Sequence, residues 1–120
     1  MSDIHQLGKS GEELAIAYYE KQNCTILETN WRFGHLEVDV IAENGDTIIF
    51  CEVKTRSSVS FGEPESFVTY QKQKNIISAA NCYVLRKNIN KDVRFDIISI
   101  VRANDDYKLT HIPDAFRPKW

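Results

Sequence analysis

Two carboxylates and an amine are spaced along this chain so that strand geometry could bring them together. Glu52 follows Asp39 by thirteen positions, and Lys54 follows Glu52 by two. Paired carboxylates bind Mg²⁺ through oxygen and leave positions for waters and a substrate phosphate. A neighbouring lysine ammonium can orient a hydroxide or stabilise the charge that develops on a phosphate during its hydrolysis. These residue types therefore indicate metal-dependent cleavage of a phosphodiester.

Two strands must position these side chains. They are expected over Leu36–Ala42 and Thr47–Lys54, both rich in valine and isoleucine. Between them lies Asn44-Gly45, a strong signal for a two-residue type I′ hairpin turn. The sequence therefore predicts an antiparallel hairpin in this region.

The predicted register decides which side chains meet. A turn centred on Asn-Gly places Asp39 opposite Phe50 and Glu37 opposite Glu52. Opposed residues share a face of the sheet, and so do residues two apart on one strand. Glu37, Asp39, Glu52 and Lys54 are therefore expected on one side. The other side would carry an apolar surface made of Val38, Val40, Ile49, Cys51 and Val53.

The same pattern has a simpler interpretation. Glu-x-Lys on a strand is common on solvated surfaces, where the two charges form an ordinary salt bridge. Carboxylates opposed across a ladder, however, repel one another unless a cation lies between them or one is protonated. On the residues alone, both a metal site and a solvated polar face stay open.

Composition bounds the class of protein. The chain has 120 residues, of which 42% are hydrophobic and 27% are charged, and this predicts one globular domain over residues 1–120. Its net charge of −2 weighs against nucleic-acid binding, although clustering of charge matters more than the sum. Three cysteines without C-x-x-C spacing argue against a disulfide framework and a zinc site. No run of apolar residues is long enough for a membrane span, so we expect a cytoplasmic protein without a membrane partner.

The hydrophobic pattern predicts the element order α-β-β-β-α-β-β. Ser10 and Glu13 could form a capping box at the start of the first helix. This order predicts an α/β fold with a central mixed β-sheet flanked by helices and containing a helical crossover. The expected elements are helices over about 8–22 and 65–87, and strands over Thr25–Arg32, Leu36–Ala42, Thr47–Lys54, Val93–Val101 and Lys108–Ile112.

Several segments together resemble a known family. The chain is similar to the YraN-like family of small bacterial proteins within the restriction-endonuclease-like superfamily, and its fold resembles that of archaeal Holliday-junction resolvases. One departure is Leu36, where the family usually has glycine. The matching segments are Gly8-x-x-x-Glu12-x-x-Ala15, Glu37–Ala42, Phe50–Arg56, Lys72 and Arg94-Phe95-Asp96.

The resemblance implies a restriction-endonuclease-like fold and a site. Asp39 and Glu52 would bind Mg²⁺ or Mn²⁺, Lys54 would assist the attacking water, and Glu12 would complete the metal site from the first helix. DNA, including branched DNA, would be the partner. A homodimer is expected by the same analogy, since resolvases of this fold act as dimers.

Other residues carry weaker expectations. Glu12 could instead be an acid in the first helical turn that interacts favourably with the helix dipole. Glu37 could be either an auxiliary acid of the site or a solvated strand residue. Lys72 begins the apolar stripe of the second helix and should reach toward the sheet, either as a phosphate contact or as a helix end that extends to solvent. Arg56 and Lys74 could contact a nucleic-acid backbone, although solvated charge is the more usual explanation.

The leading hypothesis is therefore a metal-dependent nuclease-fold protein that binds DNA and hydrolyses phosphodiesters. One alternative is a nucleic-acid-binding module of the same fold without turnover. The other is an interaction protein with no nucleic-acid partner, which the acidic net charge favours.

Overall fold

A computed structural model describes residues 10–57, 68–103 and 106–118 of the chain. Within that part, the expected order α-β-β-β-α-β-β and the mixed α/β fold are confirmed. The elements are α2 (Gly11–Lys21), β1 (Thr25–Phe33), β2 (Leu36–Asn44), β3 (Thr47–Ser57), α3 (Tyr70–Arg86), β4 (Asp92–Ala103) and β5 (Asp106–Phe116).

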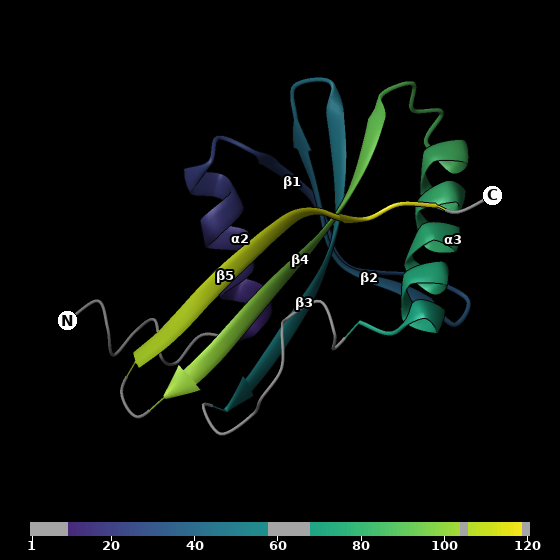
Figure 1. The fold of residues 1–120 in the computed structure, drawn as a ribbon. Coiled ribbons are helices and arrows are strands. Elements are labelled where there is room, and N and C mark those ends of the chain that lie inside the picture. The colour runs from purple at the N-terminus through teal and green to yellow at the C-terminus, as the bar shows by residue number, and fades with distance from the viewer. Residues whose placement is uncertain (1–9, 58–67, 104–105, 119–120) are drawn as a thin grey trace.

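The strands form one mixed sheet in the order β1-β2-β3-β4-β5. β3 and β4 are parallel, and the other neighbours are antiparallel. Parallel neighbours need a crossover, and α3 supplies it between β3 and β4. α2 and α3 lie on opposite sides of the sheet (Figure 1), and each covers its own cluster of buried apolar side chains.

The capping box predicted for the first helix is confirmed at the start of α2. The Glu13 backbone N–H donates to Ser10 Oγ at 3.1 Å, and the Ser10 N–H donates to Glu13 Oε1 at 2.8 Å. Gly11 begins the helix so close to β3 that a Cβ there would lie 2.0 Å from Thr55 Oγ1. This contact fixes the N-terminal turn of α2, and with it Glu12, against β3.

The second helix begins later than the sequence predicts. Thr69 is its N-cap and accepts a hydrogen bond from the Lys72 N–H at 3.1 Å, so Val68 and Thr69 precede the helix. Residues 65–67 lie outside the described part of the chain. The later start places Lys72 in the first turn, beside the sheet.

The predicted turn and register are wrong by two residues. Asn44 pairs with Thr47, so the loop consists of Gly45 and Asp46. Gly45 has a φ of 60° at the first loop position, as in a type II′ turn, instead of Asn-Gly at the centre of a type I′ turn. Phe50 therefore lies opposite Ile41, not opposite Asp39. A shift of two residues preserves the side of the sheet that each β3 side chain faces.

β2 leaves β3 just before the expected site. The β2–β3 pairing ends at Val40 and Cys51, whereas β1 and β2 stay paired as far as Phe33 and Leu36. We call residues 31–39 the β1–β2 arm, and the point where β2 leaves β3 the fork. The arm extends beyond the β2–β3 ladder by the length of residues 36–39, about 13 Å.

Strict alternation of side chains on β2 also ends at the fork. The sequence predicts Val38 and Val40 on one apolar face. In the structure Val38 packs in the cluster under α3, whereas Val40 packs in the cluster under α2. The change of face falls at Asp39, so this residue lies where the backbone of β2 departs from regular geometry.

Candidate functional site

Asp39 lies at the fork and binds the backbone of the strand that β2 has left. Its Oδ2 accepts a hydrogen bond of 2.8 Å from the Val53 N–H, in place of a carbonyl from a continued ladder. Burial raises the pKa of Asp39 to about 7, and the negative charge of Glu52 adds to the rise. The Val53 hydrogen bond acts in the opposite direction, and the charge of Glu12 raises the pKa further.

Glu52 projects from β3 toward α3. Glu52 is only 4% exposed, so its negative charge needs partners inside the protein. Lys72 Nζ lies 3.3 Å from Glu52 Oε2, and Lys54 Nζ lies 3.8 Å from the same oxygen. The prediction that Lys72 reaches toward the sheet is therefore confirmed, and it lies nearer to Glu52 than Lys54 does.

Four of the predicted site residues gather at the fork: Asp39, Glu52, Lys54 and Lys72. Asp39 and Glu52 could hold a divalent cation, since Mg²⁺ is usually bound by one or two carboxylates together with waters and substrate phosphate. Glu12 acts on Asp39 through its charge. Within residues 10–57, 68–103 and 106–118, no three His, Cys, Asp or Glu side chains form a metal-binding group. The donor set that fits a cation is thus the Asp39–Glu52 pair.

The remaining predicted residues lie outside this group. Glu37 is on the β1–β2 arm, where its Oε2 lies 3.4 Å from Arg32 Nε. Arg56 is partly buried, with Nε and Nη1 shielded from solvent. Lys74 is exposed and its Nζ lies 5.5 Å from the centre of the Tyr70 ring. Of these, Lys74 is the most open to a nucleic-acid backbone.

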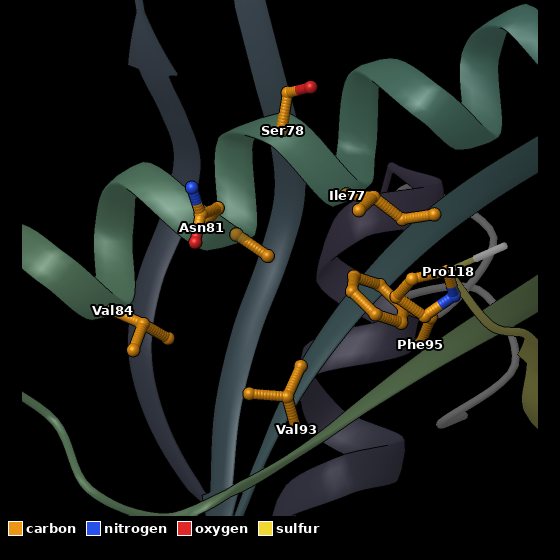
Figure 2. Close-up of a pocket in the computed structure, with 8 residues that line it drawn as sticks. Ile77, Ser78, Asn81, Val84, Val93, Phe95 and Pro118 are labelled. Carbon is orange, nitrogen blue, oxygen red and sulfur yellow. The ribbon is translucent and has the colours of Figure 1, made fainter. Parts of the chain in front are cut away.

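The cavity between α3 and β4 is separate from these residues. Figure 2 shows this pocket of about 490 Å³, which is lined mainly by apolar side chains such as Ile77, Val93 and Phe95. None of the four charged residues at the fork lines it. The cavity and the group at the fork are therefore two separate features of the molecule.

A second buried polar group, which sequence reasoning did not assign, centres on Asp96. This side chain is fully buried on β4. It accepts hydrogen bonds from the Tyr19 hydroxyl at 2.8 Å, from the Arg94 guanidinium at 2.8 and 2.9 Å, and from the Asp114 N–H at 3.0 Å. His111 Nε2 lies 2.8 Å from the same carboxylate.

This network ties α2 to the sheet. Burial alone would raise the pKa of Asp96, but the hydrogen bonds from His111, Arg94, Asp114 and Tyr19 hold it well below its usual range. The other ring nitrogen of His111 lies 2.9 Å from the Tyr18 hydroxyl. Arg94-Phe95-Asp96 was part of the family resemblance, but nothing in the spacing of His111 indicated its role.

Comparisons with known proteins place the chain in a family. Residues 11–100 match the family model described as "Uncharacterised protein family UPF0102". The chain belongs to the UPF0102 family. This confirms the resemblance to YraN-like proteins. The part of this UPF0102 chain that matches runs from the start of α2 into β4, and it contains both carboxylates of the fork and the lysines beside them.

Individual relatives cover nearly the whole chain. A UPF0102 protein of Christiangramia forsetii is 44% identical over 116 residues, which are 97% of this chain and 98% of the relative. A UPF0102 protein of Flavobacterium psychrophilum is 40% identical over 116 residues, with the same coverage. One from Bacteroides thetaiotaomicron is 40% identical over 118 residues, 98% of each chain. Among the described residues of this UPF0102 chain, no helix is long and apolar enough to cross a membrane.

Proposed function

We propose that this chain hydrolyses phosphodiester bonds in DNA, branched DNA included, with Mg²⁺ or Mn²⁺ held by Asp39 and Glu52. The observation that carries the proposal is the meeting of two carboxylates at the fork of the sheet with two lysines beside them. Burial and then the charge of Glu52 raise the pKa of Asp39, and a cation placed between the carboxylates would relieve the repulsion. When bound, it would lower the pKa of an attacking water and neutralise the leaving oxygen.

Asp39 and Glu52 are each held in place by contacts within the protein, as a preformed cation site requires. The Val53 N–H holds the Asp39 carboxylate in one orientation at the fork. Glu52 is held by burial and by the two ammonium groups. A ligand pair fixed in this way loses little conformational freedom when a cation binds.

The two lysines have the charge that a phosphate needs. Lys54 is 35% exposed and Lys72 is 45% exposed, so both can contact a ligand in solvent while they remain near Glu52. On approach of a substrate, their ammonium groups would bind phosphate oxygens and stabilise the charge that builds up as the bond breaks. Lys72 comes from α3 and Lys54 from β3, so a bound phosphate would be held from two elements.

Cleavage of a DNA panel tests the proposal. Single-stranded, duplex and four-way junction DNA would be incubated with Mn²⁺ and either the wild type, Glu52→Gln or the control Glu20→Gln. Glu20 is an exposed carboxylate on α2. We expect Glu52→Gln to lose about 100-fold or more in rate, a typical loss for removing a key electrostatic group, while Glu20→Gln cleaves as the wild type does. Equal cleavage by wild type and Glu52→Gln would refute the assignment.

A nucleic-acid-binding module without turnover is the second candidate. It is favoured by one observation, which is that Lys54 and Lys72 already partner Glu52 within the protein. This function predicts DNA binding that is unaffected by Mn²⁺, with every DNA of the panel left intact. The homodimer expected from the resemblance would be tested in the same preparations by light scattering, with and without junction DNA.

A further inference from the structure

The β1–β2 arm carries a partly exposed aromatic ring with a cation over it. Phe33 is 41% exposed, although large apolar residues in the described part of the chain are mostly buried. The Arg86 guanidinium lies 5.1 Å from the centre of the Phe33 ring. Proteins that bind single-stranded nucleic acids often stack the bases on aromatic rings, with arginine side chains nearby.

Trp31 supports this ring from within the arm. Its ring is nearly parallel to that of Phe33, with an angle of 8° and a centroid distance of 6.4 Å. Trp31 in turn packs edge-on against Tyr83 of α3, with centroids 5.2 Å apart. The arm runs out beside α3 (Figure 1), so the aromatic pair is held against a helix and is not free to swing.

The helix beside the arm and the segment that follows it are basic, although Lys72, Lys87 and Lys91 pair with glutamates of the sheet. Between Thr69 and Lys91 the sequence contains five basic residues and neither aspartate nor glutamate, in a chain whose net charge is −2. The basic residues of this segment are Lys72, Lys74, Arg86, Lys87 and Lys91.

The aromatic pair lies within a few nucleotides of the fork. Phe33 pairs with Leu36, which precedes Asp39 by three residues on β2. Three residues of a strand span about 10 Å. Trp31 and Glu52 both face α3. One strand of nucleic acid advances by about 3.4 Å per nucleotide in a duplex, so about three nucleotides cover this distance.

We propose that the β1–β2 arm binds an unpaired base, with Phe33 as its stacking platform and Arg86 as a contact to the adjoining phosphate. A base inside a duplex has both faces covered by its neighbours and cannot stack on Phe33. The substrate class is therefore nucleic acid with a single-stranded segment a few nucleotides from the bond to be cut. The position of that bond rests on the proposed function, whereas the binding of the unpaired base does not.

Binding measured in EDTA separates this inference from catalysis. Fluorescence anisotropy would compare blunt duplex DNA, the same duplex with a single-stranded tail, and single strands of DNA and of RNA. The variants are Phe33→Ala, Phe33→Leu, which keeps apolar bulk, and Phe33→Trp, which keeps a stacking face. Val93→Ala is the control, because Val93 is a similarly exposed apolar residue on β4, at 40%.

We expect Phe33→Ala and Phe33→Leu to weaken binding of tailed and single-stranded DNA by about 5- to 150-fold, the range for removing one stacked base. Phe33→Trp and Val93→Ala should bind as the wild type does, and blunt duplex should be affected less than twofold. If Phe33→Ala loses the same affinity for DNA and RNA strands, the contact is to the base. If it loses affinity for only one of them, the platform is specific for that nucleic acid.

Two results would overturn the inference. One is unchanged binding of tailed DNA by Phe33→Leu, and the other is an equal loss for tailed and blunt DNA. If either occurs while the wild type still cleaves DNA with Mn²⁺, the stacking platform fails and the proposed function stands. If the tail dependence is found but no DNA is cleaved, the proposed function fails and the platform stands.

Discussion

Replacing Asp39 with asparagine should stabilise the protein above neutral pH. Asparagine has nearly the same shape and its side-chain oxygen can still accept the hydrogen bond from the Val53 N–H. It carries no charge, so the repulsion from Glu52 and the cost of burying an ionised carboxylate are both removed. The variant therefore separates the effect of charge at the fork from the effect of shape.

The pKa of Asp39 gives the size and sign of the effect. It is raised from 3.8 to about 7 in the folded protein. Between pH 3.8 and about 7 the folded protein keeps a proton on Asp39 that the unfolded chain releases. The contribution of Asp39 to stability is therefore fully present below pH 4 and is lost as pH rises through 7. Three pH units at about 1.4 kcal/mol each give about 4 kcal/mol. Partial exposure and the coupling to Glu52 reduce this to about 2–4 kcal/mol.

Urea unfolding at pH 5 and pH 8 would measure the effect. The comparison is between wild type, Asp39→Asn and the control Asp46→Asn, which removes an exposed carboxylate from the β2–β3 turn. We expect Asp39→Asn to exceed the wild type's free energy of unfolding by only about 1 kcal/mol at pH 5 and by about 2–4 kcal/mol at pH 8. Mg²⁺ should stabilise the wild type at pH 8 but not Asp39→Asn. A wild type and variant with the same pH dependence would refute the reasoning.

Three further substitutions test how the elements around the fork are held. Asp96→Asn should lower the free energy of unfolding at pH 7 by about 3 kcal/mol or more, since it weakens a buried network of charge-assisted hydrogen bonds. Because the pKa of Asp96 is low in the folded protein, the stability of the wild type should also fall as pH drops below about 4. An acid titration followed by circular dichroism would show this loss. Gly11→Ala should cost about 1–3 kcal/mol because its Cβ would meet Thr55 Oγ1, and Thr55→Ala in the same chain should recover part of the loss in urea titrations. Lys72→Gln should lower the free energy of unfolding by about 1–3 kcal/mol, because it removes the nearer of two cations from the buried Glu52 carboxylate. It should also lower the rate of DNA cleavage by about tenfold or more in single-turnover assays.

Much of the scaffold follows from local sequence patterns. Ser10 and Glu13 define the start of α2 through contacts three residues apart, which a sequence displays directly. The side of the sheet that Glu52 and Lys54 face was also predictable, because strand alternation has a period of two. The predicted register was wrong by two residues, and such an error leaves this period unchanged.

The fork itself could not be predicted, because it depends on tertiary packing. Val38 turns toward α3 and Val40 toward α2, and the choice is made by helices that are distant in sequence. The Asp96 network has the same origin, since its partners come from α2, β4 and β5. The sequence also favoured Lys54 over Lys72 as the amine of the site, although Lys72 lies closer to Glu52 once α3 is packed.

Titration of the protein with Mn²⁺ at pH 8, followed by calorimetry, tests the central claim most directly. The claim is that Asp39 and Glu52 together form a cation site at the fork. It predicts saturable binding by the wild type and by Glu20→Gln, and binding at least about tenfold weaker in both Asp39→Asn and Glu52→Gln, because each removes one of two charged ligands. Equal affinity in all four proteins, or no binding by the wild type, would contradict the account.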